Sequence, residues 1–376
     1  FRREIRSGHS LRLRAAAIAG LASFGDAEAA GEVRSLLAAP EPEIRLAAVQ
    51  ALGRCGRGSA DLEALAERLD SGRETNQGIR DRVWESYTAI ARRASPQAEL
   101  KAAGRFATPA DPPVQRRRLS LLRALKRNPA RFGALTPGQQ VELLDALSEA
   151  QLLLEEYDAA STSIDEAMKL LADAKHPTTR RLGRRLVAVL LRLGRDKEAL
   201  ERLQAFQSSG VLDGVAPEAS PPIEIILSEA RRRLAAADDA GKFAALLGLI
   251  DLARPIAAAA SQPTRDALEQ LEQEALDKRR TVIERLLGRL AQESDAEGKL
   301  IGFGRDLVLP GVRARLSEQP TTSAPAGDLE QALIALAKKL VPGWPGFAPG
   351  GPPEARAAAL EQLRPAASAS QPAGPG

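Results

Sequence analysis

Cysteine, histidine and aromatic residues are scarce in this chain, and each scarcity excludes a kind of chemistry. The 376 residues include one cysteine and two histidines, and aromatic residues make up 3%. The single cysteine, Cys55, cannot form an internal disulfide. Metal sites normally draw on His or Cys, and a Ser or Cys nucleophile needs a base that is usually His. Because His9 and His176 lie far apart in the sequence, we predict no metal site, no cofactor and no enzymatic activity.

Long apolar runs are also absent. No stretch of about 18 apolar residues occurs, which argues against a transmembrane helix. The first residue is Phe1 and not Met, so a signal segment could have been removed upstream. We therefore leave the compartment open, with the cytoplasm favoured and with export or a cell-envelope location as alternatives.

Alanine and leucine dominate what is present. Hydrophobic residues make up 44% of the chain, and Ala and Leu are good helix formers. No stretch alternates apolar and polar residues as a half-buried strand does. The sequence predicts an all-α protein, long enough for two or three domains or for one long repeat array.

A unit of roughly 31 to 35 residues recurs in the first third of the chain. Residues 14–25 align with residues 45–56, and weaker copies follow at residues 79–90 and 114–125. Apolar residues fall at helical spacing in each copy, with a shorter helix expected between copies. Gly25 and Gly56 end the two best copies, where we expect a helix cap with positive φ.

The pattern Ile-Arg-x-x-Ala-Val-x-Ala-Leu-Gly at residues 44–53 resembles the HEAT-repeat family, in particular its short bacterial variety. The resemblance covers residues 5–127 and implies a right-handed α-solenoid of antiparallel helix pairs. In that family the motif opens the second helix of each pair, which lines the concave side. An acidic residue before the motif and the arginine of the motif link neighbouring repeats, which implies structural roles for Arg14, Arg45 and Arg80. The chain would then enter its array halfway through a repeat.

A second kind of helix pair occupies residues 139–208 and resembles tetratricopeptide (TPR) repeats. The matching features are a glycine in the turn and a small residue that opens the second helix, Ala160 in one pair and Ala199 in the next. The large aromatic residue usual in the first helix is replaced by Leu144 and Arg184. Any stack of helical hairpins shares such a pattern.

The last third is less regular. Pro255 should kink or end a helix, and the glycines of residues 298–305 lack the spacing of a phosphate loop and indicate a turn. The apolar face of a helix over residues 329–341 would either dock on the solenoid or bind a partner. The predicted organisation is HEAT-like repeats at 1–133, TPR-like repeats at 134–260, a long helix with a capping segment at 261–316, a linker at 317–327, short docking helices at 328–363 and a disordered tail at 364–376.

Charge is nearly balanced overall but unevenly placed. Basic residues number 53 and acidic residues 49. Residues 101–135 are strongly basic and residues 139–175 strongly acidic, which indicates either two solvated faces or a binding patch. The candidate partner-binding residues are Arg116, Arg123 and Arg127, which can share a helix face, followed by Arg181 and Arg185.

These observations favour a non-catalytic scaffold or a subunit of a larger assembly that binds protein partners on a concave helical surface. A nucleic-acid-binding protein that uses its arginine-rich helices is the alternative, although the net charge is only +4 and aromatic residues for base stacking are few. The sequence names no partner and leaves the oligomeric state open.

Overall fold

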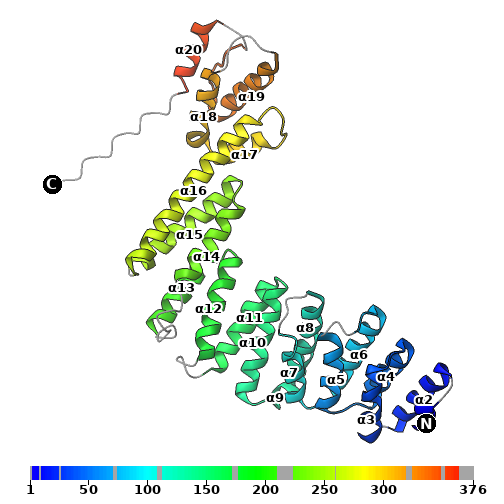
Figure 1. Ribbon diagram of the computed structural model, residues 1–376. Helices are drawn as coiled ribbons and strands as arrows, with labels where there is room; N and C mark the ends of the chain where they lie inside the picture. Colours follow the sequence, from blue (N-terminus) through cyan, green and yellow to red (C-terminus); the bar gives the residue numbers. More distant parts are fainter. Residues whose placement is uncertain are drawn as a thin grey trace. The chain divides into compact units, whose positions relative to one another are not determined.

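The computed structural model describes residues 2–7, 10–24, 27–70, 74–107, 112–171, 177–209, 223–258, 260–318, 324–348 and 352–363. Within these ranges the chain forms helices and no β-strand, which confirms the predicted all-α solenoid fold (Figure 1). His9, His176, Gly25 and the predicted tail at 364–376 lie outside the described residues.

The chain divides into two compact units, residues 1–214 and residues 215–376. The described helices of unit 1 are α1 (Arg2–Ser7), α2 (Leu11–Phe24), α3 (Ala27–Ser35), the 3₁₀ helix η1 (Leu36–Ala38), α4 (Pro42–Cys55), α5 (Ser59–Asp70), α6 (Gln77–Arg93), α7 (Pro96–Gly104), α8 (Pro112–Arg127), α9 (Pro129–Gly133), α10 (Pro137–Leu153), α11 (Tyr157–Leu170), α12 (Pro177–Arg192) and α13 (Asp196–Ser208). Those of unit 2 are α14 (Ile223–Ala236), α15 (Ala240–Ala258), α16 (Gln262–Gly288), α17 (Ala296–Phe303), α18 (Arg305–Glu318), α19 (Ala324–Leu340) and α20 (Pro353–Glu361).

In the first part of unit 1, the helices that carry the repeated motif pack side by side. Helix α4 packs on α2 and on α6, while α3, α5 and α7 pack against them as a second layer. Equivalent positions of the four copies are buried, among them Ile18, Val49, Trp84 and Leu119. A single helix pair could not bury this apolar stripe, so each repeat depends on its neighbours. Helix α1 packs on α2 ahead of the first copy.

The cap that we predicted at Gly56 is wrong. Gly56 has a φ of −65° and an extended backbone, so positive φ does not explain the glycine. Its reason is close packing, because a Cβ atom there would lie 2.7 Å from the carbonyl oxygen of Leu52 and 2.8 Å from Cδ1 of Ile90. A side chain at this position would collide with the next repeat.

Helices α10 to α13 form the two further pairs that the sequence indicates. Thr136 begins α10 with a capping box, in which its side chain and that of Gln139 each accept from the backbone of the other. Helices α8 and α10 pack against each other, so unit 1 is continuous across residue 133. The small residues Ala160 and Ala199 are both fully buried.

The turns of these two pairs have the same geometry. Glu155 has a φ of 59° and Gly194 a φ of 71°. The following amides, of Glu156 and Arg195, donate to carbonyl oxygens five residues earlier, which is the Schellman arrangement at a helix C-terminus. One copy places glycine at this left-handed position, whereas the other places glutamate there.

Unit 2 is organised along α16, which packs on α14, α15, α17 and α18. Helices α18, α19 and α20 contribute buried residues to one hydrophobic core, which they share with α16 and α17. Residues 329–341, for which the sequence left docking or partner binding open, lie in and just after α19 and dock on this core through Leu333 and Leu336. Trp344 is buried and donates from Nε1 to the carbonyl oxygen of Ala359 at 2.8 Å, which ties α20 to the segment after α19.

Of the two alternatives predicted at Pro255, a kink or a helix end, the structure excludes the end, because α15 continues to Ala258. Burial of Ile256 and Ala257 offsets the one backbone hydrogen bond that proline removes. The turn predicted for residues 298–305 is wrong for residues 298–303, which are helical because burial of Leu300 and Phe303 outweighs the weak helix propensity of glycine.

The chain turns only at Gly304, where φ is 85°. At the two ends of the predicted linker at 317–327, α18 extends to Glu318 and α19 begins at Ala324; the residues between them lie outside the described part of the chain.

Candidate protein-binding surface

Six helices of unit 1 form the candidate surface, and we call them the helix row: α2, α4, α6, α8, α10 and α12. Successive members from α2 to α10 pack on one another, and ion pairs join α12 to α10. Positions such as that of Ile18, Val49, Trp84 and Leu119 are buried and apolar in all four copies, whereas exposed positions of the row differ between repeats. One such position holds Ala19, Gln50, Glu85 and Ser120 in the four copies, all of them exposed.

Ion pairs one repeat apart hold the N-terminal members of the row in register. Nη1 of Arg14 lies 3.1 Å from Oε1 of Glu41, the residue before α4. Arg45 binds Glu74, just ahead of α6, through Nε at 2.7 Å and Nη2 at 3.1 Å. This two-point contact fixes both the distance and the orientation of the guanidinium.

Hydrogen bonding from Arg45 lowers the pKa of Glu74 below its usual value, against the opposing effect of burial. Only 2% of the Glu74 side chain is exposed. The third motif arginine, Arg80, donates from Nη1 to the backbone oxygen of Glu74 at 3.4 Å. Arg45 and Arg80 thus both reach the segment that joins two repeats.

The fourth copy replaces this arrangement by another. Gln115 occupies the motif position of Arg80 and donates to the carbonyl oxygen of Phe106 at 2.9 Å. Three residues later, Arg118 is 1% exposed at the position that Ala48 and Val83 hold in earlier copies. Its Nη2 lies 2.7 Å from Glu149 on α10. Arg118 therefore links the HEAT-like repeats to the following helix pairs.

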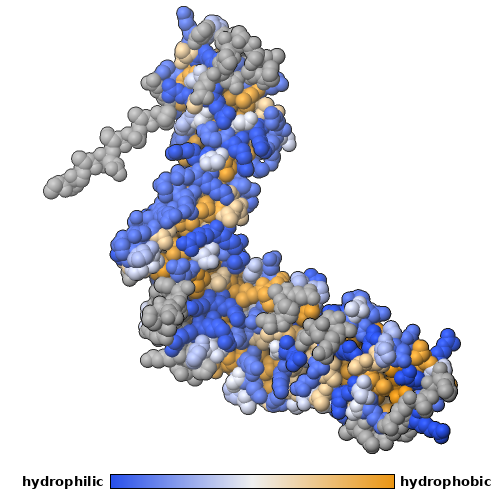
Figure 2. All heavy atoms as spheres, viewed as in Figure 1, coloured by the Kyte–Doolittle hydropathy of each residue, from blue (hydrophilic) through white to orange (hydrophobic). Residues whose placement is uncertain are grey.

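The predicted partner-binding arginines fall into two groups. Arg116 and Arg127 are exposed on α8. Arg123 forms an ion pair with Glu156, and both Arg181 and Arg185 bind Asp145 on α10, the latter at 2.6 Å from Nη1 to Oδ1. Figure 2 shows the hydrophilic surface that gathers over α12.

The three paired arginines contribute less free charge to a partner than their number suggests, because each is partly neutralised within the chain. Arg117, which the sequence did not single out, lies 5.4 Å over the ring of Trp84 and pairs with Asp81 at 2.6 Å. This contact lowers the pKa of the Asp81 carboxyl.

A second buried carboxylate lies in the other helix layer. Glu99 on α7 is 1% exposed, and Arg131 binds it at 2.8 Å and also donates to the carbonyl oxygen of Ala94. Burial raises the pKa of Glu99 in spite of the neighbouring guanidinium. The contact joins α7 to α9, so it supports packing between consecutive repeats.

The described part of the chain holds no group of three or more His, Cys, Asp or Glu side chains that could bind a metal ion. Cys55 is buried and does not form a disulfide. None of the described helices is long and apolar enough to cross a membrane.

Comparison with known proteins agrees with this frame. A family model described as HEAT repeats matches residues 4–81. The resemblance inferred from the motif at residues 44–53 is confirmed for this segment, which consists of HEAT repeats. The chain matches no curated protein. The TPR resemblance of residues 139–208 lies outside the matched segment.

Sequence reasoning overlooked two residues that organise the row, Arg118 and Asp145. Arg118 carried a detectable signal, because an arginine stands where the other copies have Ala or Val. Asp145 carried none, since exposed-looking acidic residues are common on charged helices and its two partners are on another helix.

Proposed function

We propose that this chain is a non-enzymatic protein-binding scaffold, or a structural subunit of a larger assembly, whose partners bind the helix row. The supporting observation is that the exposed position held by Ala19, Gln50, Glu85 and Ser120 changes chemistry from repeat to repeat, while the buried position held by Ile18, Val49, Trp84 and Leu119 stays apolar. A stack of this kind offers a long surface on which each repeat contributes its own contacts. The concave side implied by the HEAT resemblance is the side on which we place the partner.

Arg116 and Arg127 are the best candidates for contact on this surface. Both are exposed on the same face of α8, and neither is among the arginines described above that form ion pairs between repeats. Charged residues at such positions steer association and set orientation more than they add affinity. The partner surface that suits them is acidic.

The test compares partner capture by two charge-matched variants of the full chain. Arg116→Glu with Arg127→Glu reverses two charges on the row. Lys169→Glu with Lys197→Glu reverses two exposed charges on α11 and α13, outside the row. Arg123 is left unchanged, because glutamate there would face Glu156 and disturb the fold.

We expect the row variant to lose the partners that the wild type captures from native lysate, as measured by quantitative mass spectrometry, and the control variant to keep them. Equal capture by all three proteins would refute the proposal. Nuclease treatment that abolishes capture, together with salt-dependent binding to duplex DNA or RNA, would support the nucleic-acid alternative instead.

A further inference from the structure

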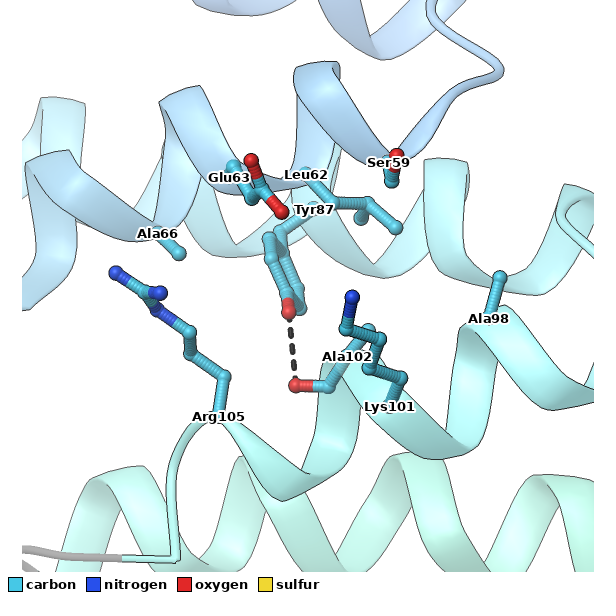
Figure 3. A pocket seen from close by; sticks show the side chains of 9 residues that line it. All are labelled: Ser59, Leu62, Glu63, Ala66, Tyr87, Ala98, Lys101, Ala102 and Arg105. Carbon is cyan, nitrogen blue, oxygen red and sulfur yellow. Dashed lines mark hydrogen bonds between the residues drawn. The ribbon is translucent and has the colours of Figure 1, made fainter.

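Two clefts in the described part of the chain differ in how much apolar surface a partner could reach. The cleft between α5 and α7 has Tyr87 as its floor, and the hydroxyl of Tyr87 donates to the carbonyl oxygen of Ala102 at 2.8 Å (Figure 3). Its apolar lining is 1–6% exposed and belongs to the packing between two repeats: Leu62, Ala66, Tyr87 and Ala102. The groove between α16 and α18 in unit 2 is open instead, because Leu307 at its edge is 42% exposed.

The groove between α16 and α18 has a cavity volume of about 410 Å³. Gly311 lets the two helices approach at one end of it, since a Cβ atom there would lie 2.6 Å from Cδ1 of Leu287. From that contact the groove runs toward the earlier residues of both helices. Ile283 is buried at its base and Leu276 is half-buried farther along α16. The groove thus offers apolar surface beside Leu307, an exposed apolar side chain.

Charged side chains line both sides of this groove. Five of its eleven lining residues are charged, which does not suit a small apolar ligand. Arg280 on α16 and Asp306 on α18 are exposed, and within the described chain neither side chain has an ion pair or a hydrogen bond. Gly311 lies beside Glu284, and Arg280 and Asp306 precede these two residues by four and five positions. The two free charges therefore lie at about the same level on opposite sides of the groove.

Free charges of opposite sign at one level make the groove complementary to itself. A two-fold axis along the groove places α16 of one copy opposite α18 of the other, so that each Arg280 meets Asp306 of the second copy. The same rotation sets the exposed Leu307 of each copy against Leu276 and Ile283 of the other. A partner surface with charge of one sign would leave either Arg280 or Asp306 unmatched.

We propose that a second copy of this chain binds here, and that unit 2 forms a two-fold symmetric dimer through the groove between α16 and α18. Two pairs of Arg280 with Asp306 set the orientation of the copies, and burial of Leu307 adds the apolar contact. The helix row belongs to unit 1, so this inference does not rest on the proposed function, and either can fail without the other.

Sedimentation velocity of the full chain measures the association. Because a contact made by one groove falls at the weak end of protein interfaces, protein concentrations should reach about 100 μM. Leu307→Asp removes the apolar contact, and Leu252→Asp is the matched control, since Leu252 on α15 is 37% exposed and lies outside the groove. Arg280→Asp and Asp306→Arg each place like charges opposite one another. Arg285→Asp is their control, at an exposed position of α16 that does not line the groove.

The wild type should form dimers, and Leu307→Asp, Arg280→Asp and Asp306→Arg should each raise the dissociation constant about tenfold or more. Both controls should stay within about twofold of the wild type. An equimolar mixture of Arg280→Asp and Asp306→Arg should associate as the wild type does, because each aspartate in the mixed dimer again faces an arginine. The double variant should associate for the same reason. A variant that failed to fold would not be rescued by mixing, so rescue separates loss of the interface from loss of structure.

Three results would overturn the proposal. One is a wild type that stays monomeric at about 100 μM, and another is a dimer that Leu307→Asp leaves intact. The third is loss of association in both charge variants without rescue in their mixture, which would show that Arg280 and Asp306 do not meet across a two-fold axis. Binding of a different protein that Leu307→Asp abolishes, while the chain itself stays monomeric, would assign the groove to that protein and refute the dimer.

Discussion

Replacement of Glu74 by glutamine should loosen the contact between two repeats without a change of shape. The Glu74 carboxylate accepts hydrogen bonds from Nε and Nη2 of Arg45. It also accepts a hydrogen bond from the backbone amide of Asn76 at 3.1 Å. Glutamine keeps one acceptor oxygen but turns an NH₂ group toward the guanidinium. A hydrogen bond to a charged group contributes roughly 1.5–3 kcal/mol to stability.

The loss of stability caused by Glu74→Gln should fall near the middle of this range. Arg45 is not orphaned by the substitution, because its Nη1 still donates to the carbonyl oxygens of Ala39 and Pro40 at 3.1 and 2.8 Å. We therefore expect Glu74→Gln to destabilise the first repeats by about 2 kcal/mol. In a repeat stack such a loss is felt by the neighbouring repeats and not by distant ones.

Hydrogen exchange of the full chain gives the local readout. A loss of about 2 kcal/mol should speed exchange of the α2 and α4 amides roughly thirtyfold, with exchange in α12 and α13 unchanged. Glu142→Gln, at an exposed position on α10, is the control and should change nothing. Glu41→Gln should have a smaller effect than Glu74→Gln, because Arg14 holds Glu41 by one contact.

The pH dependence has a definite sign. Since Arg45 lowers the pKa of Glu74 in the folded state, the stabilisation is fully present above the usual value of 4.5 and is lost as the pH falls through the lower folded value. Urea unfolding can be followed by Trp84 fluorescence in a Trp344→Phe background. The free energies of unfolding of the protein with Glu74 and of the Glu74→Gln variant should become equal below that pH. A difference that persists when Glu74 is protonated, or no difference from Glu142→Gln at pH 7, would refute the reasoning.

Three further outcomes follow from the packing. Glu155→Gly should stabilise unit 1 by about 0.5–1 kcal/mol in urea titrations, because glycine tolerates the positive φ at this turn. Gly194→Ala should destabilise unit 1 by about 1 kcal/mol for the same reason. If both substitutions changed the free energy of unfolding in the same direction, the shared turn geometry would be contradicted. Gly53→Ala should cost about 1–3 kcal/mol, since its Cβ would lie 2.6 Å from Oγ of Ser86, and Ser86→Gly should restore most of the loss in the double variant. Trp344→Phe should remove the bond to Ala359 at a cost of about 1 kcal/mol and speed hydrogen exchange in α20, with α14 unchanged as the internal control.

Apolar spacing in the sequence was enough to predict the helical repeats. Burial is a property of one helix face, and helical periodicity places a residue on that face without reference to the partner helix. Positions such as Ile18, Val49 and Leu122 were therefore predictable from their neighbours alone. The same reasoning failed at Gly56, whose reason for being glycine is the approach of Ile90 from the next repeat.

Charged residues show where the tertiary structure decides. The sequence placed Arg116, Arg123 and Arg127 on one face of a helix, but only the packing brings Glu156 to Arg123 and leaves the other two exposed. A long charged side chain can reach several partners, and its choice depends on distances between helices that are set by every side chain packed between them.

The sequence by itself determined the all-α class, the repeat register and the poverty of catalytic residue types. The tertiary structure alone decided which arginines hold repeats together and that Arg118 is buried. The physical reason is the sequence distance over which each interaction acts. Helix formation and the burial of one face follow from residues three or four apart, whereas the ion pairs join residues a whole repeat apart.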